Sequence, residues 1–138
     1  MHLLTLLALL AATLLPISQL ALASSDPVEG SWYFISGDYT NKAGEVSSAN
    51  NKKFKALRTM KDGKLAITNM GLGTYLGYVV GTYKVTDKGI VETITDSTNK
   101  NLIGQSFTFK KTIKDGNWLH EGQVLENYEQ EIWKRLDF

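Results

Sequence analysis

The chain contains 138 residues, with 15 Lys and Arg, 14 Asp and Glu, two His and no Cys. This length is enough for one domain, and a formal charge of +1 argues against a dedicated binder of nucleic acid or anionic membranes, which would carry a basic surface. The lack of Cys excludes disulfides, thiolate metal sites and cysteine nucleophiles. Two histidines, His2 and His120, cannot build a His-rich zinc site.

The start of the chain has the pattern of a secretory signal. Residues 3–15 form an apolar run that is too short to cross a bilayer comfortably, and Ala21-Leu22-Ala23 then supplies small residues before a polar segment. We therefore expect a signal peptide at residues 1–23 and a mature domain at residues 24–138, periplasmic or secreted, without stable membrane insertion. Because the segment before the apolar run has no Lys or Arg, an uncleaved N-terminal anchor is the alternative.

The rest of the chain alternates polar and apolar residues between turn-forming segments and shows no sustained helical stripe. Asp-Gly pairs such as Asp62-Gly63 and Asp115-Gly116 are typical of tight hairpin turns. The polar stretch 40–51 has no clear period and is predicted to be a long loop or a short lid over one end of the fold. The expected strands are residues 30–39, 53–60, 64–70, 74–86, 90–96, 105–113, 117–125 and 129–136.

The faces of these strands indicate a barrel. Trp32, Phe34 and Ser36 should share one face of the first strand, but neither face of residues 90–96 is cleanly apolar. A tightly packed sandwich tolerates inward polar residues poorly, whereas a barrel with a partly hydrated lumen tolerates them well. We therefore predict an all-β fold, an antiparallel up-and-down β-barrel of about eight strands.

Two short motifs carry a resemblance to a known group of proteins. Gly30-Ser31-Trp32 opens the first strand and resembles the Gly-x-Trp signature of the lipocalin-like, or calycin-type, barrels. Trp133-Lys134-Arg135 lies in the last strand, where that group places a basic residue against the signature Trp. The resemblance implies that Arg135 stacks on Trp32 by a cation–π contact at the closed end of the barrel, with Gly30, Trp32 and Arg135 as structural residues.

A longer series of segments makes the resemblance more specific. In order these are GTYKV at 81–85, VETI at 91–94, NLIG at 101–104, FTFK at 107–110, NWLHEG at 117–122 and EIWKR at 131–135. The series is similar to a family of bacterial secreted lipocalin-like domains of unknown function. The likeness runs over residues 28–136 and is weakest over residues 40–75, so ligand-facing loops there are not carried over. It implies a lipocalin-like fold and a secreted or periplasmic location, but no activity.

His120 and Glu92 are the residues with the most chemical potential. His120 should face the same side of its strand as Trp118, so it is either a polar anchor in the lumen, an axial ligand to haem iron as in related His-ligated barrels, or a hairpin histidine that is exposed or bonded to a hydroxyl. Glu92 either points inward, which requires a partner such as Arg58 or Lys111, or is solvated on the outer face.

The function expected from these residues is non-covalent binding of a small, apolar or amphipathic molecule in the lumen, with no cofactor and no nucleic acid. The candidate lining residues are Arg58, Tyr78, Glu92, Phe109, Trp118 and His120. Around the turn near Glu126, we expect Glu129 and Glu131 to be solvated.

Two alternatives belong to other functional classes. One is a lumen enzyme or haem barrel in which Glu92 and His120 converge with perturbed pKa values. The other is a protein-interaction or inhibitor module whose lumen is filled by side chains and whose loop end carries an exposed apolar patch.

Overall fold

The computed structural model describes residues 26–137, so the predicted signal peptide lies outside the described residues. Within this range, no helix is long and apolar enough to cross a membrane. A short 3-10 turn, η1 (Lys100–Leu102), interrupts the connection between β6 and β7. The strands are β1 (Gly30–Thr40), β2 (Val46–Asn50), β3 (Phe54–Lys61), β4 (Lys64–Gly71), β5 (Thr74–Thr86), β6 (Gly89–Ser97), β7 (Ser106–Lys114), β8 (Asn117–Val124) and β9 (Asn127–Leu136).

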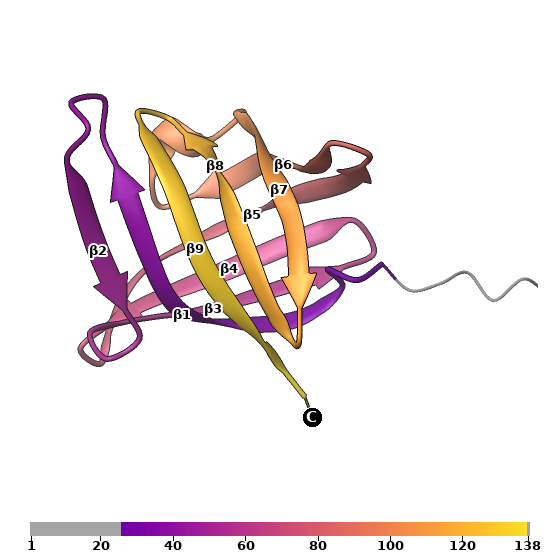
Figure 1. The fold of residues 1–138 in the computed structure, drawn as a ribbon, viewed down its shortest axis with the longest axis horizontal. Coiled ribbons are helices and arrows are strands. Elements are labelled where there is room, and N and C mark those ends of the chain that lie inside the picture. Colours follow the sequence, from indigo (N-terminus) through magenta and orange to yellow (C-terminus); the bar gives the residue numbers. More distant parts are fainter. Residues whose placement is uncertain (1–25, 138) are drawn as a thin grey trace, which may run out of the picture.

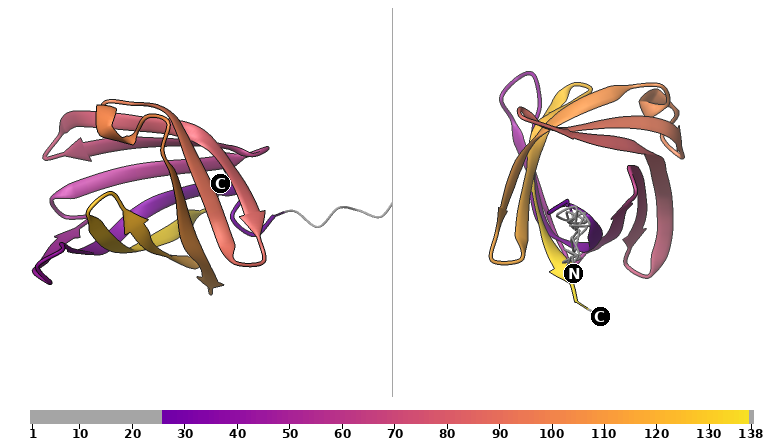
Figure 2. Two further views of the ribbon diagram at one scale, coloured as in Figure 1. Left: turned by 90° about the horizontal axis from the view of Figure 1, so that it is seen from above. Right: turned by 90° about the vertical axis from the view of Figure 1, so that its right-hand side faces the viewer.

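The strands form one antiparallel sheet that closes on itself (Figure 1). Consecutive strands from β3 to β9 pair with one another, and β1 pairs with both β3 and β9, which closes a barrel of eight strands. Figure 2 shows the resulting ring of strands end-on. The predicted all-β, antiparallel up-and-down barrel is therefore confirmed, and the eight expected strands lie within two residues of the observed ones.

The prediction of a loop or lid at residues 40–51 is wrong, because this stretch contains β2. The strand pairs with the second half of β1, from Ser36 opposite Asn50 to Thr40 opposite Val46, and forms a flap outside the closed barrel. Its residues are mostly exposed, so no apolar alternation marks it in the sequence.

A bulge in β1 changes which residues of this strand point inward, so the expectation that Trp32, Phe34 and Ser36 share one face is only partly correct. Trp32 and Phe34 are buried as predicted, but the register with β9 shifts between Phe34 and Ser36. The extra residue moves Ser36 off the inward face and places Gly37 there instead. The same shift brings Tyr39, farther along β1, to the interior of the barrel.

One end of the barrel is closed by the residues that precede β1. Val28 is fully buried, and its carbonyl oxygen accepts a hydrogen bond of 2.9 Å from the indole Nε1 of Trp32. These first described residues curl into the end of the ring that faces the viewer in the right panel of Figure 2. We call this the closed end; the turns β3–β4, β5–β6 and β7–β8 also lie there, and the β4–β5, β6–β7 and β8–β9 connections lie at the opposite, open end.

The cation–π contact implied by the resemblance is present at the closed end. The guanidinium of Arg135 lies 4.1 Å from the ring centroid of Trp32 and donates hydrogen bonds to the carbonyl oxygens of Glu29 and Pro27. A side chain at position 30 would be strained by the φ of +134°, and its Cβ, 2.6 Å from Nη1 of Arg135, would force the guanidinium to shift. Gly30, Trp32 and Arg135 thus act together to seal this end.

Candidate ligand-binding cavity

A cavity of about 260 Å³ occupies the open half of the barrel. This volume lies just below the usual range for small-molecule sites, so the space suits a ligand smaller than a typical drug. Its walls combine aromatic and aliphatic side chains with several charged ones. The apolar lining includes Phe54, Ile67, Val79, Phe107, Phe109 and Trp133, and the polar lining includes Tyr39, Arg58, Glu92, His120, Glu129 and Glu131.

A buried charged cluster forms the boundary between this cavity and the packed closed half. Arg58 on β3 donates a hydrogen bond from Nη1 to Oε1 of Glu92 on β6, and Nε2 of His120 on β8 lies 3.1 Å from the same oxygen. The three side chains are only 1–3% exposed. Glu92 therefore points inward with Arg58 as its partner, whereas Lys111 is exposed on β7.

Aromatic rings hold this cluster in place. The guanidinium of Arg58 lies 4.9 Å from the ring of Trp133 and 5.3 Å from that of Trp118, and His120 stacks on Phe109 with a centroid distance of 3.7 Å. These contacts satisfy the delocalised charge of Arg58, although its Nε has no hydrogen-bond partner among residues 26–137.

The cluster fixes the protonation states of its members. Burial alone would raise the pKa of Glu92, but the charge of Arg58 and the contact with His120 outweigh it and lower that pKa to about 2. For His120, burial and then the charge of Arg58 lower the pKa, so the ring is neutral at neutral pH. Its Nε2 then donates to Glu92, and its Nδ1 is a buried acceptor without a partner in the described chain, 3.7 Å from Oε2 of Glu131.

A second pair of carboxyl groups faces the cavity from β9, contrary to the expectation that both are solvated. Glu131 accepts hydrogen bonds from the hydroxyl of Tyr39 at 3.0 Å and from Nε1 of Trp133 at 2.8 Å. Glu129 also lines the cavity, and its side chain forms no hydrogen bond with the residues described here. Burial, followed by the repulsion of Glu131, raises the pKa of Glu129 to about 8.

The parity of β9 could have revealed this pair. The resemblance places Arg135 against the inward Trp32, and Trp133, Glu131 and Glu129, which lie two, four and six positions before Arg135, must then share its face. The nearby turn at Glu126 favours solvated carboxylates, but the alternation of β9 directs Glu129 and Glu131 inward.

Two predicted lining residues lie elsewhere. Tyr78 is on the outer face of β5, where its hydroxyl donates a 2.7 Å hydrogen bond to Asp96, because its neighbours Gly77 and Val79 are the residues that point inward. Trp118 is completely buried in the closed half, edge-on to Trp32 at 5.3 Å, so it belongs to the packed core. Of the predicted set, Arg58, Glu92, Phe109 and His120 line the cavity.

The cavity residues do not fit a haem group. An axial ligand must present a free ring nitrogen to the iron. In His120, Nε2 is held by Glu92 and Nδ1 is buried against Glu131, so neither nitrogen faces the open space. In the part of the chain that the structure describes, no group of three or more His, Asp or Glu side chains is arranged to hold a metal ion.

Comparisons with known proteins agree with this architecture. No protein-family model matches the chain, and no curated protein matches it in sequence. The structure is similar to that of a lipocalin-like protein from Bacteroides uniformis, with a TM-score of 0.53 and 12% identity over 78% of this chain and 97% of that one. It also matches an uncharacterized protein from Bacteroides eggerthii, with a TM-score of 0.48 and 17% identity over 78% and 98% of the two chains. The closed eight-strand barrel and the Bacteroides uniformis match together show that this chain has a lipocalin-like fold.

Proposed function

We propose that the protein binds a small amphipathic molecule non-covalently in the open half of its barrel. The observation that supports this most directly is the cavity of about 260 Å³, which side chains leave unfilled although the other half of the same barrel is packed. Aromatic walls favour an apolar body, because burying apolar surface is the main source of affinity in such sites.

The polar lining favours a ligand that donates hydrogen bonds. Among residues 26–137, Arg58 is the one Lys or Arg that lines the cavity, and its guanidinium is already paired with Glu92 rather than with Glu129 or Glu131. Glu131 already accepts two hydrogen bonds, whereas the Glu129 carboxyl lines the cavity without a hydrogen-bond partner among residues 26–137. An amine supplies several donors and a positive charge, so a primary amine attached to an apolar body is the chemistry that the cavity suits best.

Binding explains the site better than acid–base catalysis by Glu92 and His120. The two residues do converge, but a general acid or base needs a pKa near the working pH and access to the substrate. Glu92 is held ionised by Arg58, with a pKa of about 2, and both nitrogens of His120 are shielded. Glu92 and His120 are therefore better described, together with Arg58, as a buried structural cluster than as a catalytic pair.

We also infer that the mature protein works outside the cytoplasm. This rests on the apolar run at residues 3–15 and on the small residues at Ala21 and Ala23. Intact-mass measurement of the protein purified from its own host tests it: a chain beginning at Ser24 is expected, and one that retains residues 1–23 would contradict the inference.

The ligand proposal is tested by calorimetric titration with three probes that share a six-carbon chain: hexylamine, hexanol and hexanoate. With the titrations run at pH 9, where the Glu129 carboxyl is ionised, we expect affinity to fall in that order, because the two glutamates attract the ammonium and repel the carboxylate. If none of the probes binds, the binding function is contradicted. Hexanoate binding as tightly as hexylamine would contradict only the assignment of the polar group.

Two variants locate the polar group within the cavity. In titrations at pH 9, above the pKa of about 8 of the Glu129 carboxyl, Glu129→Gln should weaken hexylamine binding about tenfold and leave hexanol unchanged, because it removes a charge and keeps the shape. Glu126→Gln is the matched control, since Glu126 lies on the nearby β8–β9 turn but is exposed and does not line the cavity. Equal effects of the two variants would show that the amine binds outside the cavity.

A further inference from the structure

The large apolar side chains that are exposed are unevenly distributed over the molecule. Two of those in the described chain, Leu57 and Ile132, lie in the middle of strands. The turns of the closed end contribute none of them. The others all lie on connections or strand ends around the cavity mouth: Val46, Met70, Leu72, Tyr75, Leu76, Ile103 and Leu125.

The turn residues at the two ends differ in the same way. At the closed end, Asp62 and Asp115 occupy the first turn position with φ of 50° and 53°, a conformation that Asp tolerates. At the open end, Leu72 and Leu125 occupy the equivalent position with φ of 49° and 51°. Leu is strained there because its Cβ crowds the backbone, and Leu72 gains nothing in return within the protein because it is 86% exposed.

The β4–β5 hairpin concentrates this apolar surface. Residues 65–83 contain no charged side chain over 19 positions. A bulge at Leu76, where the register moves from Asn69–Gly77 to Met70–Tyr75, turns this extra leucine outward. We call the exposed side chains of Met70, Leu72, Tyr75 and Leu76 the β4–β5 tip.

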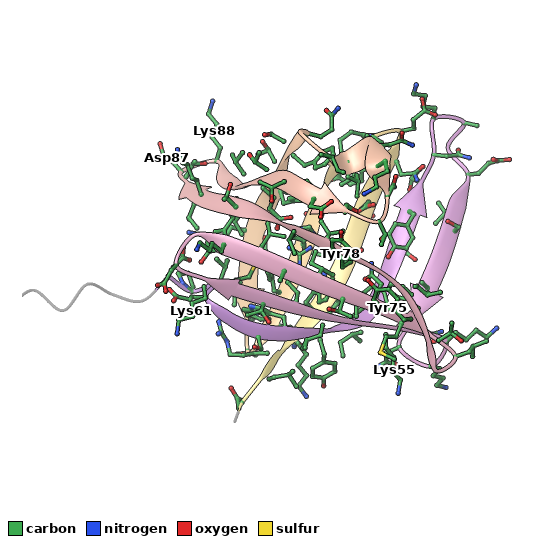
Figure 3. All side chains as sticks on the ribbon, turned by 180° about the vertical axis from the view of Figure 1, so that it is seen from behind. Lys55, Lys61, Tyr75, Tyr78, Asp87 and Lys88 are labelled. Atoms are coloured by element: carbon green, nitrogen blue, oxygen red, sulfur yellow. The ribbon has the colours of Figure 1, made fainter. Side chains whose placement is uncertain are left out.

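Lysines lie directly beside the β4–β5 tip. The backbone N–H of Leu72 donates to the carbonyl oxygen of Lys53, and Lys55 is opposite Met70 in the register of β3 and β4. Figure 3 shows Lys55 and Tyr75 together at one end, with Lys61, Asp87 and Lys88 at the other. Among the described residues, Lys53 and Lys55 form no ion pair, and neither does Lys52.

We propose that the open end docks reversibly on the surface of an anionic phospholipid bilayer, with the β4–β5 tip in the interface and Lys52, Lys53 and Lys55 against the lipid phosphates. Leucines on separate turns, with tyrosine and lysine beside them, are typical of segments that enter the interfacial region. Individually projecting side chains suit a deformable bilayer better than the complementary surface of a protein partner.

The proposal goes beyond ligand binding and does not require it. It also modifies an expectation from composition, because the overall charge of +1 hides a local excess of lysine beside an uncharged hairpin. Docking at this end would place the cavity mouth against the bilayer, while the closed end stays in water.

The test is co-sedimentation of residues 24–138, the chain expected after cleavage, with two kinds of vesicle: phosphatidylcholine alone, and phosphatidylcholine mixed with phosphatidylglycerol. We expect binding to the mixed vesicles that weakens with salt, and much weaker binding to phosphatidylcholine alone. No sedimentation with the mixed vesicles overturns the proposal. Concentration-dependent dimers without vesicle binding would overturn it in favour of contact between two copies.

Variants separate docking from folding. Leu72→Asn combined with Tyr75→Ser should reduce binding to mixed vesicles by about tenfold or more, because two apolar groups no longer enter the interface. Leu72→Asn alone should keep or raise the urea midpoint, since Asn accepts the positive φ. Leu57→Asn is the control for Leu72→Asn, since it removes one exposed apolar side chain in mid-strand, and it should leave binding unchanged. Wild-type binding by the double variant would overturn the proposal.

Discussion

The two halves of the barrel are built from the same strands but differ in what those strands direct inward. In the closed half, Trp32, Met60, Ile90 and Trp118 are almost completely buried and pack against one another. In the open half, the inward positions include charged side chains around a cavity. The strand β9 supplies both, with Arg135 at the closed end and Glu129 at the open end. The packed core and the cavity are thus separated along the barrel axis rather than between strands.

The largest expected effect contrasts one aromatic residue from each half. Trp32→Ala should lower the free energy of unfolding by about 3–5 kcal/mol, because it leaves a cavity in a packed core and removes the ring under Arg135. Phe107→Ala should cost only about 1 kcal/mol, since this ring lines space that is already open. Urea denaturation measures both. Equal losses would show that the open half is as important for stability as the closed half.

The second-largest loss in the free energy of unfolding is expected at the buried charged cluster between the two halves. Arg58→Met removes the partner of Glu92 and leaves a carboxylate buried, which should cost about 3 kcal/mol. Adding Glu92→Leu should recover much of this loss, because a buried pair contributes mainly by compensating its own desolvation. A double-mutant cycle in urea measures the coupling. If the second substitution brings no recovery, the cluster has a stabilising role beyond mutual neutralisation.

The pH dependence of the free energy of unfolding reports on the open half through one residue, Glu129. The pKa of Glu129 is raised to about 8 from 4.5, so its contribution to stability is complete below pH 4.5 and is lost as the pH rises toward 8. The lowered pKa values of His120 and Glu92 act in the opposite sense, since their contributions are lost as the pH falls below about 6.5 and 4.5 respectively. Between pH 6.5 and 8, only Glu129 among these three residues changes stability.

We therefore expect the free energy of unfolding to fall by roughly 1–2 kcal/mol between pH 6.5 and 8, within the limit of about 1.4 kcal/mol per pH unit for one proton. The charged or titratable groups that line the cavity with Glu129 are Arg58, Glu92, His120, Tyr39 and Glu131. Glu129→Gln should flatten the profile in this window. A wild-type profile that is already flat would show that Glu129 is ionised and solvated.

The sequence predicted the fold better than the site, for reasons that particular residues make clear. Asp-Gly turns and alternating strands marked eight of the nine strands, whereas the polar strand β2 gave no such signal. Alternation also explains why Glu92 and His120 point inward. It failed at the bulge after Phe34 and at Leu76, because a bulge depends on pairing with a partner strand that sequence does not specify.

The smallest expected effect concerns two ion pairs of the same chemistry in different surroundings. Lys42 and Glu126 form a contact of 2.8 Å between two turns of the open rim, and both side chains are 74% exposed. Water and salt screen such a pair, and ordering two flexible side chains offsets most of its attraction, so Lys42→Ala should leave the urea midpoint unchanged within error. The contrast with Arg58→Met tests whether burial, rather than the ion pair itself, gives the boundary cluster its importance. A measurable loss at Lys42 would mean that the rim is an ordered part of the cavity mouth, and ligand affinity should then fall with it.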